Sequence, residues 1–502
     1  MLVVILSSEN DLAGTGQDIV RIFYPDARIV LEPVGNYDLA LTVSASVNGN
    51  VLTGQASLKT LGSPVKEDTA IQRKLATGDV RNQLKWLVKL ALFRILVRFT
   101  ETSPGPWGIL TGIRPTKIVH RLLDLSWEQP QIIEYLSDYY AMAVNKAVLL
   151  TQIASGQRPF LMPEEQAEST VSIYIGIPFC PTRCAYCSFP AYPVDKWGQL
   201  TDLFLDALQR EIYKVGSVLK RQGIGVQAIY IGGGTPTTLN EYQLASLLKT
   251  VRQFLVSGIT SEITLEAGRP DTISEDKLRI AVENGITRLS INPQSMKAET
   301  LKAIGRKHLP EDIVLTMNAA RGYGFKTINM DIILGLPGES AEDVANTLRE
   351  IRLLNPENLT VHTLAVKRTS QIKESSEEYS LPAGREVEKM LDLTAKIAGQ
   401  MDMHPYYLYR QKNMVGQLEN IGYCLTGHEC SYNIQIIEER QTIIGLGGGA
   451  GTKLVTPGTW QLTSYYNPKD PDNYIQRIDE LANRKVSLLN EFFAGIRSNI
   501  EK

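Results

Sequence analysis

Short runs of apolar and β-branched residues alternate with longer amphipathic stretches from about residue 170 to residue 365. Six of these runs have the length and composition of buried strands. They are SIYIGI (172–177), QAIYIG (227–232), EITLEA (262–267), TRLSIN (287–292), KTINMDIIL (326–334) and LTVHTLA (359–365). Apolar residues recur at helical spacing between them, as in 200–222 and 241–256. This alternation predicts an α/β fold whose parallel strands are joined by right-handed crossovers.

The regions on either side follow other patterns. Before residue 165, strands are predicted at 1–6, 27–32 and 39–46, and long helices around 66–100 and 131–155. After residue 380, helices are predicted at 384–401 and 474–497, with the glycine run 447–449 between them. We therefore predict an α+β domain over 1–165, an α/β domain over 166–380 and a mostly helical domain over 381–502, with a Pro-containing linker at the first boundary.

Length and composition narrow the class of protein. The chain has 502 residues, too many for one compact core, and 43% hydrophobic and 21% charged residues are ordinary for a globular protein. A formal net charge of −2 gives no electrostatic reason to expect nucleic acid as a partner. The most apolar helical stretch contains Lys89, Arg94 and Arg98, so we expect an amphipathic helix and no membrane span. Five cysteines without a recognisable secretory signal favour a reducing compartment, and we expect a cytoplasmic protein.

Three of the five cysteines fall within PFCPTRCAYCSFP, in the pattern C-x3-C-x2-C. Three cysteines with one histidine can bind zinc, although zinc motifs usually comprise two separated pairs. A ferredoxin-type cluster takes four cysteines. Three ligands, Cys180, Cys184 and Cys187, would leave one iron of a [4Fe–4S] cluster open to another ligand. The remaining cysteines lie in CLTGHEC, where Cys424, His428 and Cys430 are metal-ligand types but lack a fourth ligand.

Polar residues and glycines gather where the predicted strands end. The candidates are Tyr174 in the first strand, Gly232, Gly233, Gly234 and Thr235 after the second, Glu266 at the end of the third, Gln294 and Arg306 after the fourth, and Asp331 in the fifth. In barrels of parallel strands, chemistry collects at the carboxyl ends. Glycines there let the backbone approach a ligand closely, although a Gly-Gly-Gly turn by itself is weak evidence.

The segment YIGIPFCPTRCAYC resembles the signature of radical S-adenosylmethionine (SAM) enzymes, and Tyr186 matches the aromatic residue usual before the third cysteine. This resemblance implies a [4Fe–4S] cluster held by Cys180, Cys184 and Cys187, with Tyr174 beside it. The amino and carboxylate groups of SAM would bind the fourth iron, and an electron would cleave SAM to a 5′-deoxyadenosyl radical. It also implies an electron donor such as flavodoxin or ferredoxin. The expected fold is a partial (β/α)6 TIM-like barrel whose mouth is covered by 381–502.

Five further segments are similar to the oxygen-independent coproporphyrinogen III oxidases, also called coproporphyrinogen dehydrogenases. They are GIPFC, YIGGGTPTTL, RLSINPQS, GRKH and INMDIILGLPGE, and the similarity covers about 165–370. It implies that SAM is contacted by Tyr174, Gly232, Gly233, Gly234, Thr235, Glu266, Gln294, Arg306, Asp331 and the backbone of Ala365. The family carries a histidine at the position of Gly176 and a fourth cysteine at the position of Phe189. These departures concern the family's second SAM site and its acid–base residues, whereas the features needed for SAM cleavage are kept.

The implied reaction converts two propionates of coproporphyrinogen III to vinyl groups, giving protoporphyrinogen IX in haem biosynthesis. Because this tetrapyrrole is a tetra-anion, we expect cations to bind it. The candidates are Lys367, Arg368, Arg410 and Lys412. Two other functions stay open: a haem-binding chaperone, and another tetrapyrrole-directed radical SAM reaction such as haem methylation with ring opening.

Overall fold

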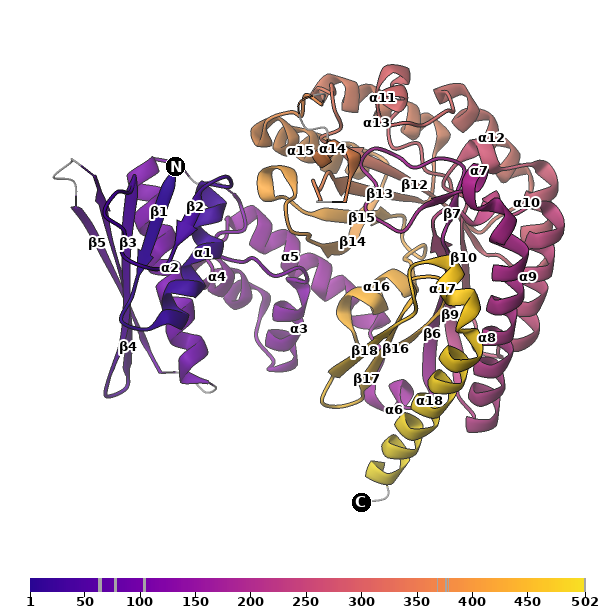
Figure 1. The fold of residues 1–502 in the computed structure, drawn as a ribbon, viewed down its shortest axis with the longest axis horizontal. Helices are drawn as coiled ribbons and strands as arrows, with labels where there is room; N and C mark the ends of the chain where they lie inside the picture. The colour runs from indigo at the N-terminus through magenta and orange to yellow at the C-terminus, as the bar shows by residue number, and fades with distance from the viewer. Residues whose placement is uncertain are drawn as a thin grey trace. The chain divides into compact units, whose positions relative to one another are not determined.

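The computed structural model describes residues 1–61, 66–75, 79–102, 105–367, 369–374, 377 and 379–500. The chain forms two compact units. The first comprises Met1–Gln152 with Gly416–Leu418, and the second comprises Ile153–Val415 with Glu419–Lys502. Figure 1 labels the elements of both units. The three-domain division, with 381–502 covering the barrel mouth, stays a prediction.

The first unit contains a five-stranded sheet in the order β2-β1-β3-β4-β5. Its strands are β1 (Leu2–Leu6), β2 (Arg28–Val30), β3 (Leu39–Asn48), β4 (Val51–Thr60) and β5 (Lys66–Lys74). Strand β1 pairs in parallel with β2 and β3, whereas β3, β4 and β5 form an antiparallel meander. Helices α1 (Asn10–Phe23) and α2 (Val80–Thr100) pack on this sheet and bury Ile5, Leu41 and Leu87. A Cβ at Gly54 would lie 2.6 Å from the backbone of Leu87, so glycine lets α2 approach β4 closely.

Two of the predicted helices differ from the structure. Residues 66–74 form β5, and helix α2 begins only at Val80, after Asp79 caps it by accepting the Arg81 N–H at 2.8 Å. The predicted helix around 131–155 is divided into α4 (Gln129–Tyr139) and α5 (Val144–Gln157), because Ala141 between them adopts φ 52°. Helix α3 (Thr116–Asp124) precedes them. Within the described ranges, no helix is both long and apolar enough to cross a membrane.

The second unit is built on an eleven-stranded sheet in the order β14-β15-β13-β12-β11-β10-β9-β6-β16-β17-β18. All six predicted strands are present, as β6 (Thr170–Ile177), β9 (Gly225–Gly233), β10 (Glu262–Glu266), β11 (Arg288–Ser290), β12 (Thr327–Leu334) and β13 (Asn358–Thr363). They run parallel to their neighbours, as expected for a partial barrel of alternating strands and helices. A short pair, β7 (Phe179–Cys180) and β8 (Tyr192–Pro193), lies outside this sheet.

The C-terminal region supplies five further strands of the same sheet. They are β14 (His404–Tyr409), β15 (Asn420–Cys424), β16 (Thr442–Gly447), β17 (Gly451–Thr456) and β18 (Gln461–Tyr466). Strand β16 pairs in parallel with β6, and the other four pair antiparallel at the two edges. The expected helices are also present, as α15 (Gly384–Gln400), α16 (Ser431–Glu438), α17 (Pro471–Gln476) and α18 (Ile478–Ile500).

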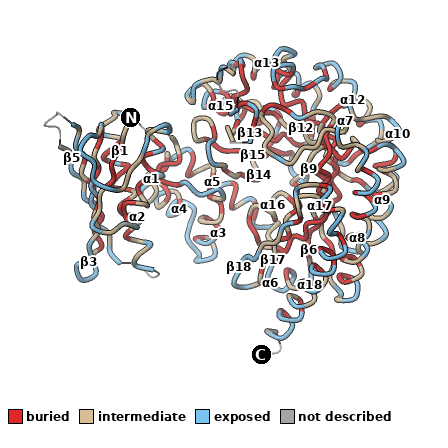
Figure 2. The backbone as a smooth tube through the Cα atoms, viewed as in Figure 1, coloured by how far each residue is buried: buried red, intermediate tan, exposed pale blue. Residues whose placement is uncertain are grey.

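Helices on the outside of the sheet follow its parallel strands. They are α8 (Thr201–Gln222), α9 (Glu241–Phe254), α10 (Glu275–Glu283), α12 (Pro310–Gly322) and α13 (Ala341–Leu354), and Figure 1 shows α8, α9, α10 and α12 along one side of the strands. Side chains of Asn240, Ser274 and Ser340 cap three of them, and such a cap contributes about 1 kcal/mol. Shorter helices are α6 (Glu164–Ala167), α7 (Val194–Trp197), α11 (Ala298–Ala303) and α14 (Gln371–Glu374). The strands are mostly buried, while the outer helix faces are exposed (Figure 2).

Candidate active site

A cavity of about 520 Å³ lies at the carboxyl ends of the parallel strands. This volume is typical of cofactor and substrate pockets. The cavity brings together most of the predicted site residues. They are Tyr174, Cys180, Cys184, Cys187, Gly233, Gly234, Thr235, Glu266, Gln294, Arg306, Asp331, Ala365 and Lys367. Residues from six separate strand–loop segments of the sequence therefore meet in one place.

Three of the predicted residues that the structure describes are not among those that line the cavity. Gly232 lies directly behind it, because a Cβ there would come within 2.6 Å of the Glu266 carboxylate. Arg410 is buried, and burial lowers its pKa to about 10. Lys412 is exposed to solvent. Arg368 lies outside the described residues.

The three cysteines occupy a loop that the strand ends hold in place. Cys180 ends β7, and the backbone N–H of Cys187 donates to the Cys184 carbonyl at 3.0 Å. The hydroxyl of Thr235 lies 3.6 Å from the Cys180 sulfur. Burial raises the pKa of Cys180 to about 12 and also raises the pKa of Cys187. Thiolates at these positions therefore require a positive partner, as a bound metal centre provides.

The glycine turn after β9 supports this loop through its backbone. Gly233 has φ 111°, a conformation that side chains disfavour, and the Gly234 N–H donates to the Ile177 carbonyl at 2.7 Å. A Cβ at Gly234 would lie 2.9 Å from the Cys180 sulfur and 2.4 Å from the Phe179 carbonyl oxygen. Glycine is therefore required here for the cysteine loop to seat against β9.

Glu266 lines the cavity, and no cation among the described residues lies within hydrogen-bond distance of its carboxyl group. Tyr230 donates its hydroxyl to Oε1 at 2.6 Å, and the Gly233 N–H donates to Oε2 at 3.2 Å. Burial, together with the nearby Asp331 carboxylate, raises the pKa of Glu266 to about 7. A ligand that brings hydroxyl or ammonium groups would stabilise the ionised form.

Asp331 is the second carboxylate in the cavity, and its neighbours are polar. Asn329 donates to its Oδ1 at 2.7 Å, and the Nε2 of His362 lies 3.7 Å from its Oδ2. The other ring nitrogen of His362 lies 3.3 Å from the Tyr409 hydroxyl. Sequence reasoning missed His362 and Tyr409, although His362 stands in the sixth predicted strand, where a polar residue in an apolar run was a usable signal.

Gln294 adopts an unusual backbone conformation at the cavity wall. Its φ of 65° places a non-glycine residue in the left-handed region, which costs about 1–2 kcal/mol. Two backbone hydrogen bonds hold it there, from the Gln294 N–H to the Asp331 carbonyl at 2.9 Å and from the Ile333 N–H to the Gln294 carbonyl at 3.0 Å. Its side-chain Oε1 is buried and has no hydrogen-bond partner in the part of the chain that the structure describes. A strained residue with an unsatisfied acceptor fits a position that contacts a ligand.

Two buried arginines lie beside the cysteine loop. Arg306 donates to the Gly268 and Asn292 carbonyls at 3.1 and 2.6 Å and to the Tyr186 hydroxyl at 3.2 Å. Its Nε is buried without a partner. Arg269, which sequence reasoning missed, forms a bidentate pair with Asp271 at 2.9 Å and lies 3.8 Å from the Cys184 sulfur. These cations favour negative charge on the cysteine loop.

The glycine run 447–449 has a packing role and is not among the residues that line the cavity. The Gly448 N–H donates to the Gly176 carbonyl at 3.1 Å. A Cβ at Gly176 would lie 2.7 Å from the Gly448 carbonyl oxygen, and a Cβ at Gly447 would lie 2.4 Å from the Gly176 carbonyl oxygen. A histidine at position 176 would collide with this turn, which explains the glycine there.

Comparisons with known proteins agree with this geometry. Residues 174–351 match the Radical SAM superfamily. The oxygen-independent coproporphyrinogen-III oxidase-like protein HemZ of Bacillus subtilis (strain 168) is 38% identical over 478 residues, 95% of this chain and 95% of that protein. The heme chaperone HemW of the same organism is 30% identical over 295 residues, 57% of this chain and 73% of that protein. The solved structure of coproporphyrinogen III oxidase (HemN) from Escherichia coli, a radical SAM enzyme, aligns with a TM-score of 0.52 and 26% identity over 66% of this chain and 73% of that chain.

The cavity also fits the cofactors that these comparisons imply, a [4Fe–4S] cluster and SAM. Three thiols line one side of it, as a cluster with an open iron requires. The opposite walls supply the unpartnered Gln294 oxygen and the Glu266 carboxyl group. These are groups that amino and hydroxyl functions would satisfy. The chain thus belongs to the radical SAM superfamily, within the family of oxygen-independent coproporphyrinogen III oxidase-like proteins.

Proposed function

We propose that the protein catalyses the oxidative decarboxylation of coproporphyrinogen III to protoporphyrinogen IX in anaerobic haem biosynthesis, with an electron donor such as flavodoxin or ferredoxin. The observation that carries this proposal is the single cavity that contains three thiols, two carboxylates and the cation Lys367. The fold similarity to the Escherichia coli coproporphyrinogen III oxidase supports it. A [4Fe–4S] cluster held by Cys180, Cys184 and Cys187 would supply the electron that cleaves SAM to a radical able to remove hydrogen from a substrate propionate. The substrate radical would then lose carbon dioxide and one electron to give the vinyl group, which balances the electron used to cleave SAM.

The chain itself binds, orients and excludes water in this scheme. Cys180, Cys184 and Cys187 hold the cluster, and the Gly233–Gly234 turn fixes their loop. Glu266 accepts hydrogen bonds from hydroxyl or amino groups of SAM, and Gln294 offers a free acceptor beside it. Arg306, held by the carbonyls of Gly268 and Asn292, presents positive charge toward the carboxylate of SAM.

Lys367 is the residue proposed to bind a substrate propionate. It lines the cavity, and its ammonium group lies 5.9 Å from the centre of the Phe189 ring. Burial lowers its pKa, so a carboxylate that approaches it replaces part of the lost hydration. In the part of the chain that the structure describes, no carboxylate pairs with this lysine. An anionic substrate group is therefore the natural partner.

A haem chaperone is the second candidate, because the chaperone HemW of Bacillus subtilis is 30% identical to this chain. That similarity covers 57% of the chain, whereas the oxidase-like HemZ covers 95% of it. The greater coverage favours the oxidase-like assignment. The alignment with HemZ also extends over the N-terminal unit, which supports this choice.

One anaerobic assay separates the candidates. Reconstituted protein is incubated with SAM, a reductant and coproporphyrinogen III, and the tetrapyrroles are resolved by chromatography and mass spectrometry. Protoporphyrinogen IX, with 5′-deoxyadenosine and carbon dioxide formed in proportion, is the expected result. Tight haem binding without turnover would instead identify a chaperone, and a methylated open-chain product would identify the other radical SAM reaction. Either result contradicts the proposal.

A further inference from the structure

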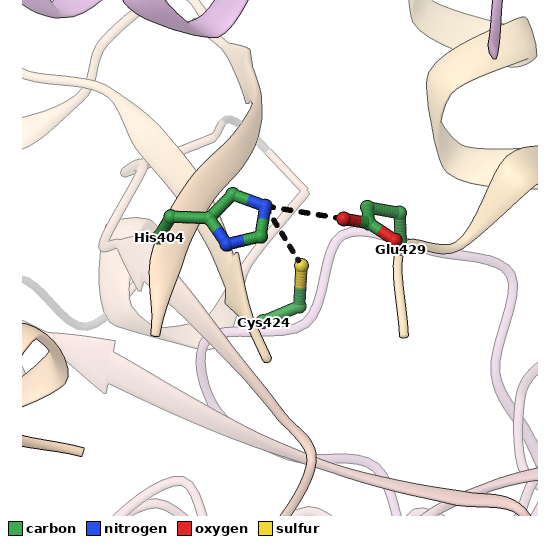
Figure 3. Close-up of side chains that lie close together, drawn as sticks. All are labelled: His404, Cys424 and Glu429. Carbon is green, nitrogen blue, oxygen red and sulfur yellow. Dashed lines mark hydrogen bonds and ion pairs between the residues drawn. The ribbon is translucent and has the colours of Figure 1, made fainter. Parts of the chain in front are cut away.

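A second group of metal-ligand side chains lies at the β14–β15 edge of the large sheet. His404 and Cys424 are directly opposite each other in the antiparallel register of these two strands. Opposed residues on adjacent strands have their Cβ atoms about 5 Å apart, so the two side chains meet by construction. Glu429 reaches the same point from the segment before α16 (Figure 3). None of the three lines the cavity described above.

Two of the three separations between the ligand atoms are close to the edges of a metal coordination tetrahedron. The Nε2 of His404 lies 3.7 Å from the Cys424 sulfur and 3.2 Å from Oε1 of Glu429. Zinc bond lengths of about 2.1 Å to nitrogen and oxygen and about 2.3 Å to sulfur give tetrahedral edges of about 3.6 and 3.4 Å for these pairs. All three ligand atoms lie within 4.8 Å of one another. One ion therefore reaches all three with small side-chain movements.

A nearby backbone N–H group fixes the orientation of the Glu429 carboxylate. The Gly427 N–H donates to Oε2 of Glu429 at 3.0 Å, which leaves Oε1 facing the imidazole. The Glu429 side chain is 8% exposed and the His404 side chain is 42% exposed. Solvent thus reaches the group from the His404 side, where a water molecule would complete four-coordination.

The two other metal-ligand types in CLTGHEC are engaged elsewhere. The Nδ1 of His428 lies 2.9 Å from the Thr327 hydroxyl. The Cys430 thiol donates to Glu262 at 3.2 Å, and the same carboxylate accepts the Ser431 and Tyr432 N–H groups at the start of α16. The local sequence spacing therefore suggests the wrong partners for Cys424, and its true partners come from an adjacent strand and from Glu429.

We propose that His404, Cys424 and Glu429 bind one divalent metal ion of the zinc type, which joins the β14–β15 edge to the segment that begins α16. A thiolate and a carboxylate neutralise the charge of such an ion, and the imidazole binds as a neutral ligand. The guanidinium of Arg288 lies nearby, but it is engaged by Glu262 at 3.9 Å and donates to the His428 carbonyl at 3.0 Å. Arg288 therefore neutralises only part of the thiolate charge.

Metal analysis of the full chain with its iron–sulfur cluster in place tests this proposal. Protein loaded anaerobically with zinc and then desalted is expected to retain about one zinc per chain beside its cluster iron. Cys424→Ser and His404→Gln are expected to weaken zinc binding about tenfold or more while the iron content is unchanged. Cys430→Ser is the matched control, because this cysteine lies six residues away and is not a ligand. Cobalt(II) substitution is expected to give a thiolate-to-metal absorption band that Cys424→Ser abolishes.

The variant in which Cys180, Cys184 and Cys187 are all replaced by serine separates the two thiol sites. It is expected to lose iron and to keep the zinc. The proposal is overturned if the wild-type chain retains no zinc, if Cys424→Ser retains it, or if the triple serine variant loses it, since that last result would place the zinc at the cluster cysteines.

Discussion

Two carboxylates in the second unit, the fully buried Glu211 and the partly buried Glu266, have opposite surroundings. Glu211, on α8, accepts hydrogen bonds from the Tyr474 hydroxyl at 2.6 Å and the Gly447 N–H at 2.8 Å, and it pairs with Lys485 at 2.5 Å. Glu266, in the cavity, has hydrogen bonds from Tyr230 and Gly233 but no ion pair with a cation of the described residues. The protein thus supplies Glu211 with hydrogen bonds and a counter-ion, whereas the counter-charge of Glu266 is left for a ligand to supply.

The same contrast extends to the surroundings of the two groups. Around Glu211, Asn467 donates to the carboxylate at 3.1 Å and accepts from Lys485 at 3.2 Å, so that the polar groups satisfy one another. Around Glu266, the cavity contains the strained Gln294, with its unpartnered oxygen, and the unpartnered Nε of Arg306. The unsatisfied groups around Glu266 therefore lie where a ligand can satisfy them, whereas the groups around Glu211 satisfy one another.

The largest expected effect is the loss of the cluster in Cys184→Ala. Removing one of three ligands leaves two thiols, which are too few to hold a [4Fe–4S] cluster. We expect the purified protein to lose its cluster iron, its brown absorbance and all turnover, while the circular dichroism spectrum stays that of the folded chain. Iron analysis and visible absorption measure this.

Cys430→Ala serves as the matched control for that loss. Cys430 is also buried, but it lies outside the cavity and bonds Glu262. The control should keep its iron. Full iron content in Cys184→Ala would contradict the assignment of Cys184 as a cluster ligand. It would also contradict the inference that a cofactor binds in the cavity.

The structural carboxylate gives the next largest effect. In Lys485→Met, Glu211 stays buried without its cation, and we expect a loss of about 3–5 kcal/mol in the free energy of unfolding, measured by urea denaturation. Lys214→Met, on the same helix as Glu211, removes an exposed ion pair with Asp479 that spans 3.5 Å. That control should change stability by less than about 1 kcal/mol. Equal effects of the two substitutions would remove the distinction between a satisfied core group and a surface pair.

The sequence predicted the parallel strands well because each is a short apolar run buried on both faces. It also predicted the cysteine loop and most of the residues that line the cavity, because Glu266 ends β10 and Asp331 lies within the apolar strand β12, where a charged residue is unusual. Residues 66–74 were wrongly predicted as helix. Their many charged side chains suit either element, and only pairing with β4 makes them a strand.

Contacts between distant segments could not be predicted from local pattern. The pairing of β16 with β6, the Glu211–Lys485 pair and the meeting of His404 with Cys424 all depend on which strands become neighbours. Arg269 was missed for a related reason. Its bidentate partner Asp271 is close in sequence, but its position beside Cys184 is set by the fold.

The pH dependence of stability tests the unsatisfied state of Glu266. Burial raises its pKa from 4.5 to about 7, so the folded protein holds this proton more tightly than the unfolded chain does. Stability contributed by the group is therefore present at low pH and lost as pH rises from about 4.5 to about 7, at about 1.4 kcal/mol per pH unit at most. Without SAM, we expect the free energy of unfolding of Glu266→Gln to rise by about 2–3 kcal/mol relative to that of wild type as the pH increases from 5 to 8, measured by urea denaturation.

The change of that difference with pH shows whether Glu266 is unsatisfied in the free protein. A constant difference between Glu266→Gln and wild type across the range would mean that the carboxylate is already satisfied in the free protein. Added SAM should reduce the gain, because a ligand that donates to the carboxylate stabilises its ionised form.

The smallest expected effect concerns the cavity cation. Lys367 is half-buried and has no carboxylate partner among the described residues, whereas Lys412 is exposed and does not line the cavity. If Lys367 binds an anionic group of the substrate, Lys367→Met should raise KM for coproporphyrinogen III about three- to tenfold, with kcat little changed. This corresponds to a loss of at most about 1.4 kcal/mol of binding free energy. Lys412→Met should leave both constants unchanged within about twofold. A larger rise in KM for Lys412→Met than for Lys367→Met would mean that the anionic substrate binds at the surface. Lys367 would then not bind the substrate.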